Sequence, residues 1–234
     1  MKKLTLLRHA KSSWDDPVER DFDRPLNDKG KRAAAVMGRF VRSKALSFDQ
    51  VLASPAVRVI ETLENFEEAS GLALEPTWDR KIYLASSATL LDVLRGANRD
   101  ADHILMVGHN PGLEDLIFDL IPDDGTSPAR DEVETKYPTA ALAEMTLAID
   151  SWADINEKCG KLDRFLPAKG ARIIAIAHFS ARAFLALAAI PLLLTLSPAK
   201  AEEETAAAEP ERWSILVTYG EDKCPESAEG EIVV

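Results

Sequence analysis

Three short motifs combine arginine, histidine and serine in patterns suited to phosphate chemistry. They are Arg8-His9, Ser54-Pro55-x-x-Arg58 and Gly108-His109-Asn110-Pro111. The guanidinium of an arginine presents a planar fork of N–H donors that matches the oxygens of a phosphate group. Near neutral pH a histidine acts as a nucleophile, a general base or a charged donor. Two arginines and two histidines brought together would therefore bind a phosphoryl group and attack it.

Each of the three motifs follows a predicted strand. Residues 4–7 and 51–53 form short β-type runs, and the near-continuous apolar run 104–107 is typical of a strand covered on both faces. In an open α/β sheet, ligands bind beyond the carboxyl ends of the strands. The spacing therefore predicts that Arg8, His9, Arg58 and His109 converge on one pocket.

Helical patterns separate these strands. The periodicity of 28–44 predicts an amphipathic helix with basic residues on its outer face. Ser54 and Pro55 suit the N-cap and first position of a second helix. Further helices are expected over 86–94 and 113–121, and a later strand over 141–149. Alternating elements of this kind indicate an α/β fold, a three-layer sandwich with a mostly parallel central sheet.

The motifs resemble those of the histidine phosphatase superfamily, which has the phosphoglycerate-mutase-like fold. The residues that carry the resemblance stand in the family's order: 7–12 (Leu-Arg-His-Ala-Lys-Ser), 23–26 (Asp-Arg-Pro-Leu) with Gly30, 54–58 and 108–111. Ala10 stands where many members have glycine. The particular residues of these motifs are similar to those of the SixA branch, the small phosphohistidine phosphatases. The similarity extends over residues 1 to about 166.

The resemblance implies roles for the four predicted residues. His9 would attack phosphorus in line and form a phosphohistidine, which water then cleaves. Arg8, Arg58 and His109 would bind the substrate by its non-bridging oxygens, so that catalysis is mostly positioning and electrostatics. Neither histidine needs a metal in this scheme. We therefore expect no metal and no other cofactor.

The general acid of larger relatives, a glutamate, has no clear counterpart in the region 75–83. Asp79 and Asp15 are the acidic candidates for that role, and Asp15 falls where many relatives have a phosphate-binding asparagine. We interpret Asp23 and Arg24 as a structural pair. An alkoxide leaving group needs a proton, whereas a phosphorylated imidazole leaves as a much less basic nitrogen. The lack of a clear glutamate acid therefore favours phosphohistidine in a protein as the substrate.

Two other functions stay open at this stage. One is a small-molecule phosphomonoesterase or a mutase of the phosphoglycerate type on the same scaffold, with a small phosphate ester as its partner. The other is a non-catalytic phosphate-binding module tethered to a membrane. Nucleic acid is not an expected partner, because the 234 residues hold 28 Lys and Arg against 39 Asp and Glu, a net charge of −11.

Charge and hydropathy divide the chain into three predicted parts. Residues 1–170 form the histidine phosphatase domain, which we expect in the cytoplasm. Residues 171–201 are a hydrophobic segment that is like a signal peptide, placed internally, or like a membrane helix in contact with lipid through 173–197. A helix packed on the domain is the third interpretation of this segment. Residues 202–234 form an acidic tail, predicted to be largely disordered. One hypothesis is fusion to the start of an exported protein, by gene fusion or as an artefact of frame annotation.

Overall fold

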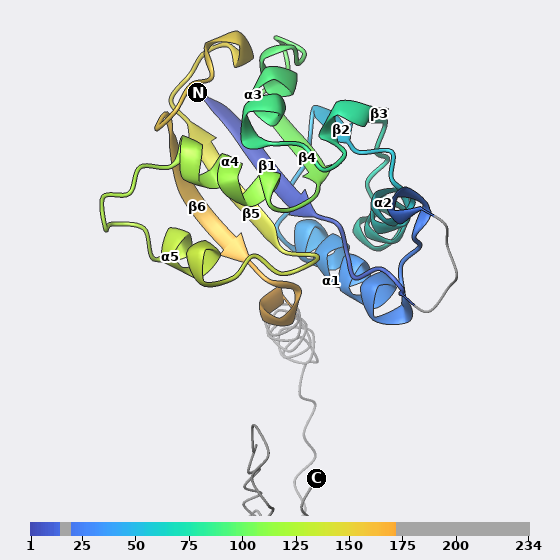
Figure 1. The fold of residues 1–234 in the computed structure, drawn as a ribbon. Coiled ribbons are helices and arrows are strands. Elements are labelled where there is room, and N and C mark those ends of the chain that lie inside the picture. The colour runs from blue at the N-terminus through green and yellow to red at the C-terminus, as the bar shows by residue number, and fades with distance from the viewer. Residues whose placement is uncertain (15–19, 172–234) are drawn as a thin grey trace, which may run out of the picture. The chain divides into compact units, whose positions relative to one another are not determined.

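A six-stranded sheet forms the centre of the protein (Figure 1). The computed structural model describes residues 1–14 and 20–171. The strand order across the sheet is β3-β2-β4-β1-β5-β6. The strands are β1 (Lys2–Arg8), β2 (Gln50–Ala53), β3 (Pro76–Trp78), β4 (His103–Gly108), β5 (Leu142–Leu147) and β6 (Gly160–Leu166).

The four strands from β3 to β1 all run in parallel, which confirms the mostly parallel sheet expected from the sequence. The register of β1 on β4 sets Arg8 opposite Gly108, and β2 joins β4 with Ala53 opposite Val107. The sheet is nevertheless mixed, because β5 is antiparallel to both β1 and β6. The three motifs therefore leave the sheet at the same edge, from neighbouring strands.

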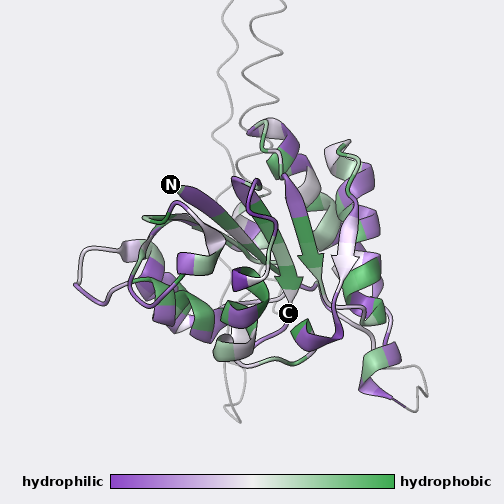
Figure 2. Ribbon diagram, turned by 90° about the horizontal axis from the view of Figure 1, so that it is seen from above, coloured by the Kyte–Doolittle hydropathy of each residue, from purple (hydrophilic) through white to green (hydrophobic). Residues whose placement is uncertain are grey.

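Helices cover both faces of the sheet, as a three-layer sandwich requires (Figure 1). Leu7, Leu105 and Val107 pack with α1 (Asp28–Ser43) and α2 (Val57–Ser70) on one face. Leu6 and Met106 point to the other face. The helices on that side are α3 (Ser87–Arg95), α4 (Gly112–Leu120) and α5 (Pro128–Thr135). The apolar residues of the central strands lie in their middle, as in residues 104–107 of β4, whereas the helices alternate between apolar and hydrophilic residues (Figure 2).

The predicted start of α2 at Ser54 and Pro55 is wrong. The helix begins at Val57, and its N-cap residue is Ala56, which makes no side-chain capping bond. Ser54 is fully buried and its hydroxyl contacts His109 instead. Ser54 therefore contacts the candidate site at the carboxyl ends of the strands and does not cap the helix. The other predicted helices lie within one residue of their expected bounds.

Strands β3 and β6 and helix α5 are not among the elements that the sequence patterns predict. Three short 3₁₀ turns complete the described part: η1 (Asp21–Asp23), η2 (Arg80–Ile82) and η3 (Trp152–Asp154). Among the described helices, all are too short or too polar to cross a membrane. The predictions for 172–201 and for 202–234 lie outside the described residues, as does Asp15.

Candidate active site

His9 directly follows β1, and the hydrogen bond of its ring shows which of the two ring nitrogens carries the proton. Its Nδ1 lies 2.8 Å from the carbonyl oxygen of Ala10. Because a carbonyl oxygen only accepts hydrogen bonds, Nδ1 must carry the proton and donate. In the neutral imidazole this leaves Nε2 unprotonated. The geometry therefore fixes the tautomer that a nucleophilic histidine needs.

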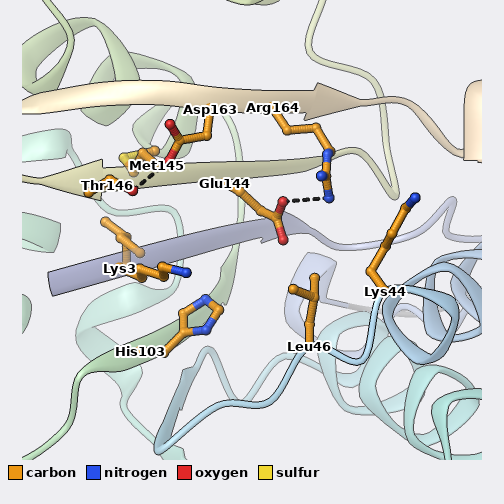
Figure 3. A pocket seen from close by; sticks show the side chains of 10 residues that line it. Lys3, Lys44, Leu46, His103, Glu144, Met145, Thr146, Asp163 and Arg164 are labelled. Atoms are coloured by element: carbon orange, nitrogen blue, oxygen red, sulfur yellow. Dashed lines mark hydrogen bonds and ion pairs between the residues drawn. The ribbon is translucent and has the colours of Figure 1, made fainter.

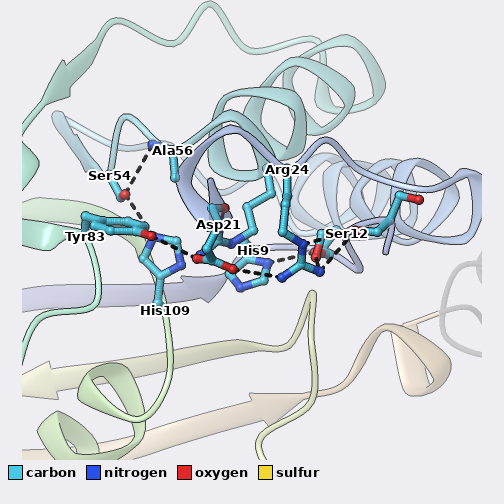
Figure 4. Close-up of polar contacts among 11 residues, drawn as sticks. His9, Ser12, Asp21, Arg24, Ser54, Ala56, Tyr83 and His109 are labelled. Atoms are coloured by element: carbon cyan, nitrogen blue, oxygen red, sulfur yellow. Dashed lines mark hydrogen bonds and ion pairs between the residues drawn. The ribbon is translucent and has the colours of Figure 1, made fainter. Parts of the chain in front are cut away.

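His109 faces His9 across the edge of the sheet (Figure 4). The two ring centroids are 5.0 Å apart, with the rings tilted by 52°. His109 Nε2 lies 2.9 Å from Ser54 Oγ. Its Nδ1 is buried and has no hydrogen-bond partner among the described residues. A buried polar nitrogen left in this way is suited to donate to an oxygen of a bound ligand.

Arg8 approaches the same place from the last position of β1. One terminal nitrogen, Nη1, donates to the carbonyl oxygen of Tyr137, and the Nε atom is buried without a partner among the described residues. Asn110, which follows His109, donates to Glu114 Oε2 at 2.5 Å. The site thus brings Arg8 and both histidines together, as the sequence predicts.

Arg58 is held by a residue that the sequence analysis did not single out, Asp21. Arg58 Nη2 donates to Asp21 Oδ2 at 2.8 Å, and Nη1 donates to the Asp21 carbonyl oxygen at 2.6 Å. Tyr83 donates its hydroxyl to Asp21 Oδ2 at 2.9 Å, and Arg24 Nη1 donates to Oδ1 at 2.9 Å (Figure 4). The expected structural pair of Asp23 with Arg24 is therefore a pair of Asp21 with Arg24.

Two contacts fix the segment after β1 against the helices. Thr62 Oγ1 accepts the backbone N–H of Ala10 at 2.9 Å and donates to the carbonyl oxygen of Arg58 at 2.5 Å, so α2 links His9 to Arg58. At Gly30, a Cβ atom would lie 2.2 Å from the carbonyl oxygen of Lys11. Glycine at this position lets α1 approach the segment, which explains its place in the motif.

Burial and the arginine charges keep both histidines neutral. Burial lowers the pKa of His9 to about 4, and the charges of Arg58 and Arg8 act in the same direction. Burial likewise lowers the pKa of His109 to about 3, helped by His9 and Arg58. Burial alone would raise the pKa of Asp21, but hydrogen bonds from Tyr83 and Arg24 and the charge of Arg58 lower it to about 2. Near neutral pH the site holds two neutral imidazoles and an ionised carboxylate.

These pKa values predict the acid side of the pH dependence. We expect kcat/KM, which reports the free enzyme, to fall as the pH drops through about 4, because protonated His9 has no lone pair for attack. The unfolded chain binds protons on both histidines near pH 6.5, and the folded chain does not. Their stabilising contribution is therefore complete above pH 6.5 and is lost as the pH falls towards their folded values.

Rate profiles and urea unfolding at several pH values would check both statements. The variant His9→Ala serves as the control for stability, and its free energy of unfolding should fall less steeply over this range. An acid limb of kcat/KM centred near pH 6.5 would show that His9 has its ordinary pKa and would contradict the prediction.

Of the two predicted general acids, Asp79 lies in the described part of the chain, where its side chain contacts the backbone of η2. Asp79 Oδ1 accepts the backbone N–H of Lys81 at 2.8 Å and caps η2. Asp15 lies outside the described residues. The role of each as an acid stays a prediction. In the described ranges, 1–14 and 20–171, no three His, Cys, Asp or Glu side chains gather as metal ligands would, and independence from metals also stays a prediction.

A separate cavity of about 330 Å³ lies at the amino ends of β1 and β4 (Figure 3). Its lining mixes Lys3 and Arg164 with Glu144 and Asp163. His103 lines this cavity and is partly buried, with Nε2 2.8 Å from Thr5 Oγ1. This cavity is therefore separate from the site of Arg8, His9, Arg58 and His109, which lies at the carboxyl ends of the parallel strands.

Comparison with known proteins agrees with this geometry. Residues 4–80 match the family model of the histidine phosphatase superfamily (branch 1). An uncharacterised protein of Mycobacterium tuberculosis is 31% identical over 160 residues, which cover 68% of this chain and 98% of that relative. The chain belongs to the histidine phosphatase superfamily.

Solved structures of the SixA branch are similar to this member of the superfamily. A protein of Agrobacterium tumefaciens, provisionally named phosphohistidine phosphatase SixA, is 28% identical with a TM-score of 0.59, covering 70% of this chain and 97% of its own. A protein of Nakamurella multipartitia with the same provisional name is 27% identical with a TM-score of 0.61, covering 71% and 96%. The phosphoglycerate-mutase-like fold of the described domain is thereby confirmed.

Proposed function

We propose that this protein removes phosphate from phosphohistidine in a partner protein, through a covalent phosphoenzyme on His9. The observation that carries the proposal is the state of His9: Nδ1 donates to Ala10 and Nε2 holds the lone pair, while burial keeps the pKa at about 4. A neutral imidazole with a fixed tautomer is an activated nucleophile without any further base.

The reaction proceeds in two displacements. His9 Nε2 donates its lone pair to phosphorus, and the bond from phosphorus to the substrate nitrogen breaks. The departing imidazole carries a proton on its other ring nitrogen, so it keeps that electron pair and leaves as a neutral imidazole. A second water molecule then attacks the phosphorus on His9, which releases orthophosphate and restores the free imidazole. Arg8 and Arg58 neutralise the charge that spreads over the non-bridging oxygens in both steps.

The leaving group supports phosphohistidine over a phosphate ester. The carboxylate bonded within the site, Asp21, has a pKa of about 2 and so has no proton to donate near neutral pH. An imidazole leaves without strong acid catalysis, whereas an alkoxide does not. The proteins of Agrobacterium tumefaciens and Nakamurella multipartitia, similar to this chain over 70% and 71% of its length, are provisionally named phosphohistidine phosphatases.

A substrate panel tests the proposal. Purified enzyme is offered a protein phosphorylated on histidine and a set of phosphomonoesters, including sugar phosphates and phosphoglycerate, under the same conditions. We expect kcat/KM for the phosphohistidine protein to exceed that for every ester by at least about 10²-fold, a difference in activation free energy of about 2.7 kcal/mol. Faster turnover of any phosphomonoester would favour a small-molecule phosphatase or mutase and would contradict the proposal.

A further inference from the structure

We propose that Asp21 is an internal anion that occupies the terminal N–H donors of Arg58 when no substrate is bound, and that the substrate phosphoryl group must exchange with it at Arg58. The inference rests on the proposed function, because it assigns Arg58 to the phosphate. It adds a residue that sets how tightly the site binds phosphate and which anions it selects.

The surroundings of Asp21 are those expected for a bound oxyanion. Its carboxylate accepts hydrogen bonds from Arg58, Arg24 and Tyr83, at 2.8, 2.9 and 2.9 Å (Figure 4). Two of these donors are guanidinium groups, which form the strongest hydrogen bonds to carboxylates and phosphates. Burial and the neighbouring Asp21 raise the pKa of the Tyr83 hydroxyl, so that group keeps its proton for donation.

The contact uses both terminal nitrogens of Arg58. Nη2 binds the Asp21 side chain, and Nη1 binds its backbone carbonyl oxygen. The Arg58 side chain is only 3% exposed and comes from the first turn of α2, so it has little freedom to reach elsewhere. The guanidinium edge formed by Nη1 and Nη2 can face a phosphoryl group on His9 only when Asp21 gives up at least one of these bonds.

Asp21 is the partner that is able to move. Its side chain is 45% exposed, and it begins the three-residue turn η1, whose N-cap residue makes no side-chain capping bond. The carboxylate carries one negative charge, whereas a phosphoryl group carries up to two and has three acceptor oxygens. A phosphoryl group therefore gains from the exchange, but a carboxylate ligand would only replace an equal partner.

The exchange has a cost and a benefit. Phosphate binds only to the fraction of molecules in which Asp21 has left Arg58, so the apparent affinity is reduced by that fraction. In return, the buried Arg58 charge keeps a partner when no substrate is bound, and an unpaired buried charge would be strongly destabilising. Asp21 thus selects for ligands with more charge than its own.

Binding of orthophosphate to the full-length protein tests this exchange without any turnover. Isothermal titration near neutral pH compares the wild type with Asp21→Asn, and with Asp23→Asn as the matched control. Asp23 is an exposed acid in the same turn, two residues away. We expect Asp21→Asn to bind orthophosphate at least about tenfold more tightly, because one charge-assisted bond no longer competes. Asp23→Asn should stay within about twofold of the wild type, as expected for a surface substitution away from the site.

Thermal unfolding gives a second readout. Without phosphate, Asp21→Asn should melt below the wild type, since Arg58 loses its partner. Added orthophosphate should raise the melting temperature of Asp21→Asn more than that of the wild type. If Asp21→Asn does not fold, Asp21→Ser is measured in the same two ways, and it should change binding in the same direction.

Weaker or unchanged phosphate binding in Asp21→Asn or Asp21→Ser would overturn the exchange and indicate that Asp21 holds Arg58 in place for the phosphate. This result is distinct from a failure of the proposed function. A phosphoenzyme on His9 together with unchanged binding would overturn the exchange alone. Tighter binding in the variant without any phosphoenzyme would overturn the proposed function alone.

Discussion

Replacing His9 by alanine is expected to abolish hydrolysis of phosphohistidine and the formation of a phosphoenzyme. The substitution removes the protein atom that forms a bond to phosphorus in the proposed mechanism, Nε2 of the tautomer fixed by Ala10. We expect turnover to fall on the order of 10³-fold or more, as when the nucleophile of another covalent enzyme is removed. The variant should still bind orthophosphate, because Arg8 and Arg58 remain.

The experiment follows the transfer of radiolabelled phosphate from a phosphohistidine protein to the enzyme. The label on the wild type should be lost in acid, as expected of a phosphorylated imidazole. His103→Ala is the matched control, because it removes a histidine that lies at the opposite edge of the sheet. Retention of an acid-labile label in His9→Ala would place the phosphoryl group on another residue and contradict the assignment.

Replacing Arg58 by alanine is expected to reduce kcat by about 10²- to 10³-fold, the size seen when a preorganised donor to a developing charge is removed. The fork of Arg58 lies beside both histidines closely enough to lower their pKa values. Its loss should therefore also move the acid limb of the rate profile to higher pH, since a positive charge no longer opposes protonation of His9.

The conservative variant Arg58→Lys separates charge from geometry. Arg58→Lys should restore the wild-type pH profile, because the positive charge is kept. It should restore only part of the lost rate, because an ammonium group is a point charge without the two parallel donors of arginine. Arg39→Ala, on the exposed side of α1, is the control and should leave the rate unchanged. An undiminished rate in Arg58→Ala would show that Arg58 does not stabilise the transition state and would contradict the prediction.

The order of elements around the site follows from short-range patterns in the sequence. The apolar run before His109 requires cover on both faces, and the strand β4 lies at the centre of the sheet between β2 and β1. Because β1, β2 and β4 are parallel, the residues that follow them meet at one edge. The convergence of Arg8, His9, Arg58 and His109 was therefore predictable, while their catalytic roles stay predictions.

The errors have equally local causes. Ser54 and Pro55 satisfy the capping preferences of a helix start, but Ser54 is buried against His109, and this tertiary contact outweighs the preference. Asp23 stands next to Arg24 in the chain, yet Asp21 makes the ion pair, because η1 turns its first residue towards Arg58 and Tyr83. No sequence pattern distinguishes two acids that are two residues apart in a short turn.

The sequence by itself determined which residues gather at the carboxyl ends of the parallel strands and predicted the class of chemistry, because residue types and strand ends are local properties. Only the tertiary structure decided the state of the site. The tautomer of His9, the neutral form of both histidines and the anion on Arg58 depend on burial and on contacts between residues far apart in the chain. Desolvation and charge act through space, so a linear pattern names these groups but does not set their protonation or their partners.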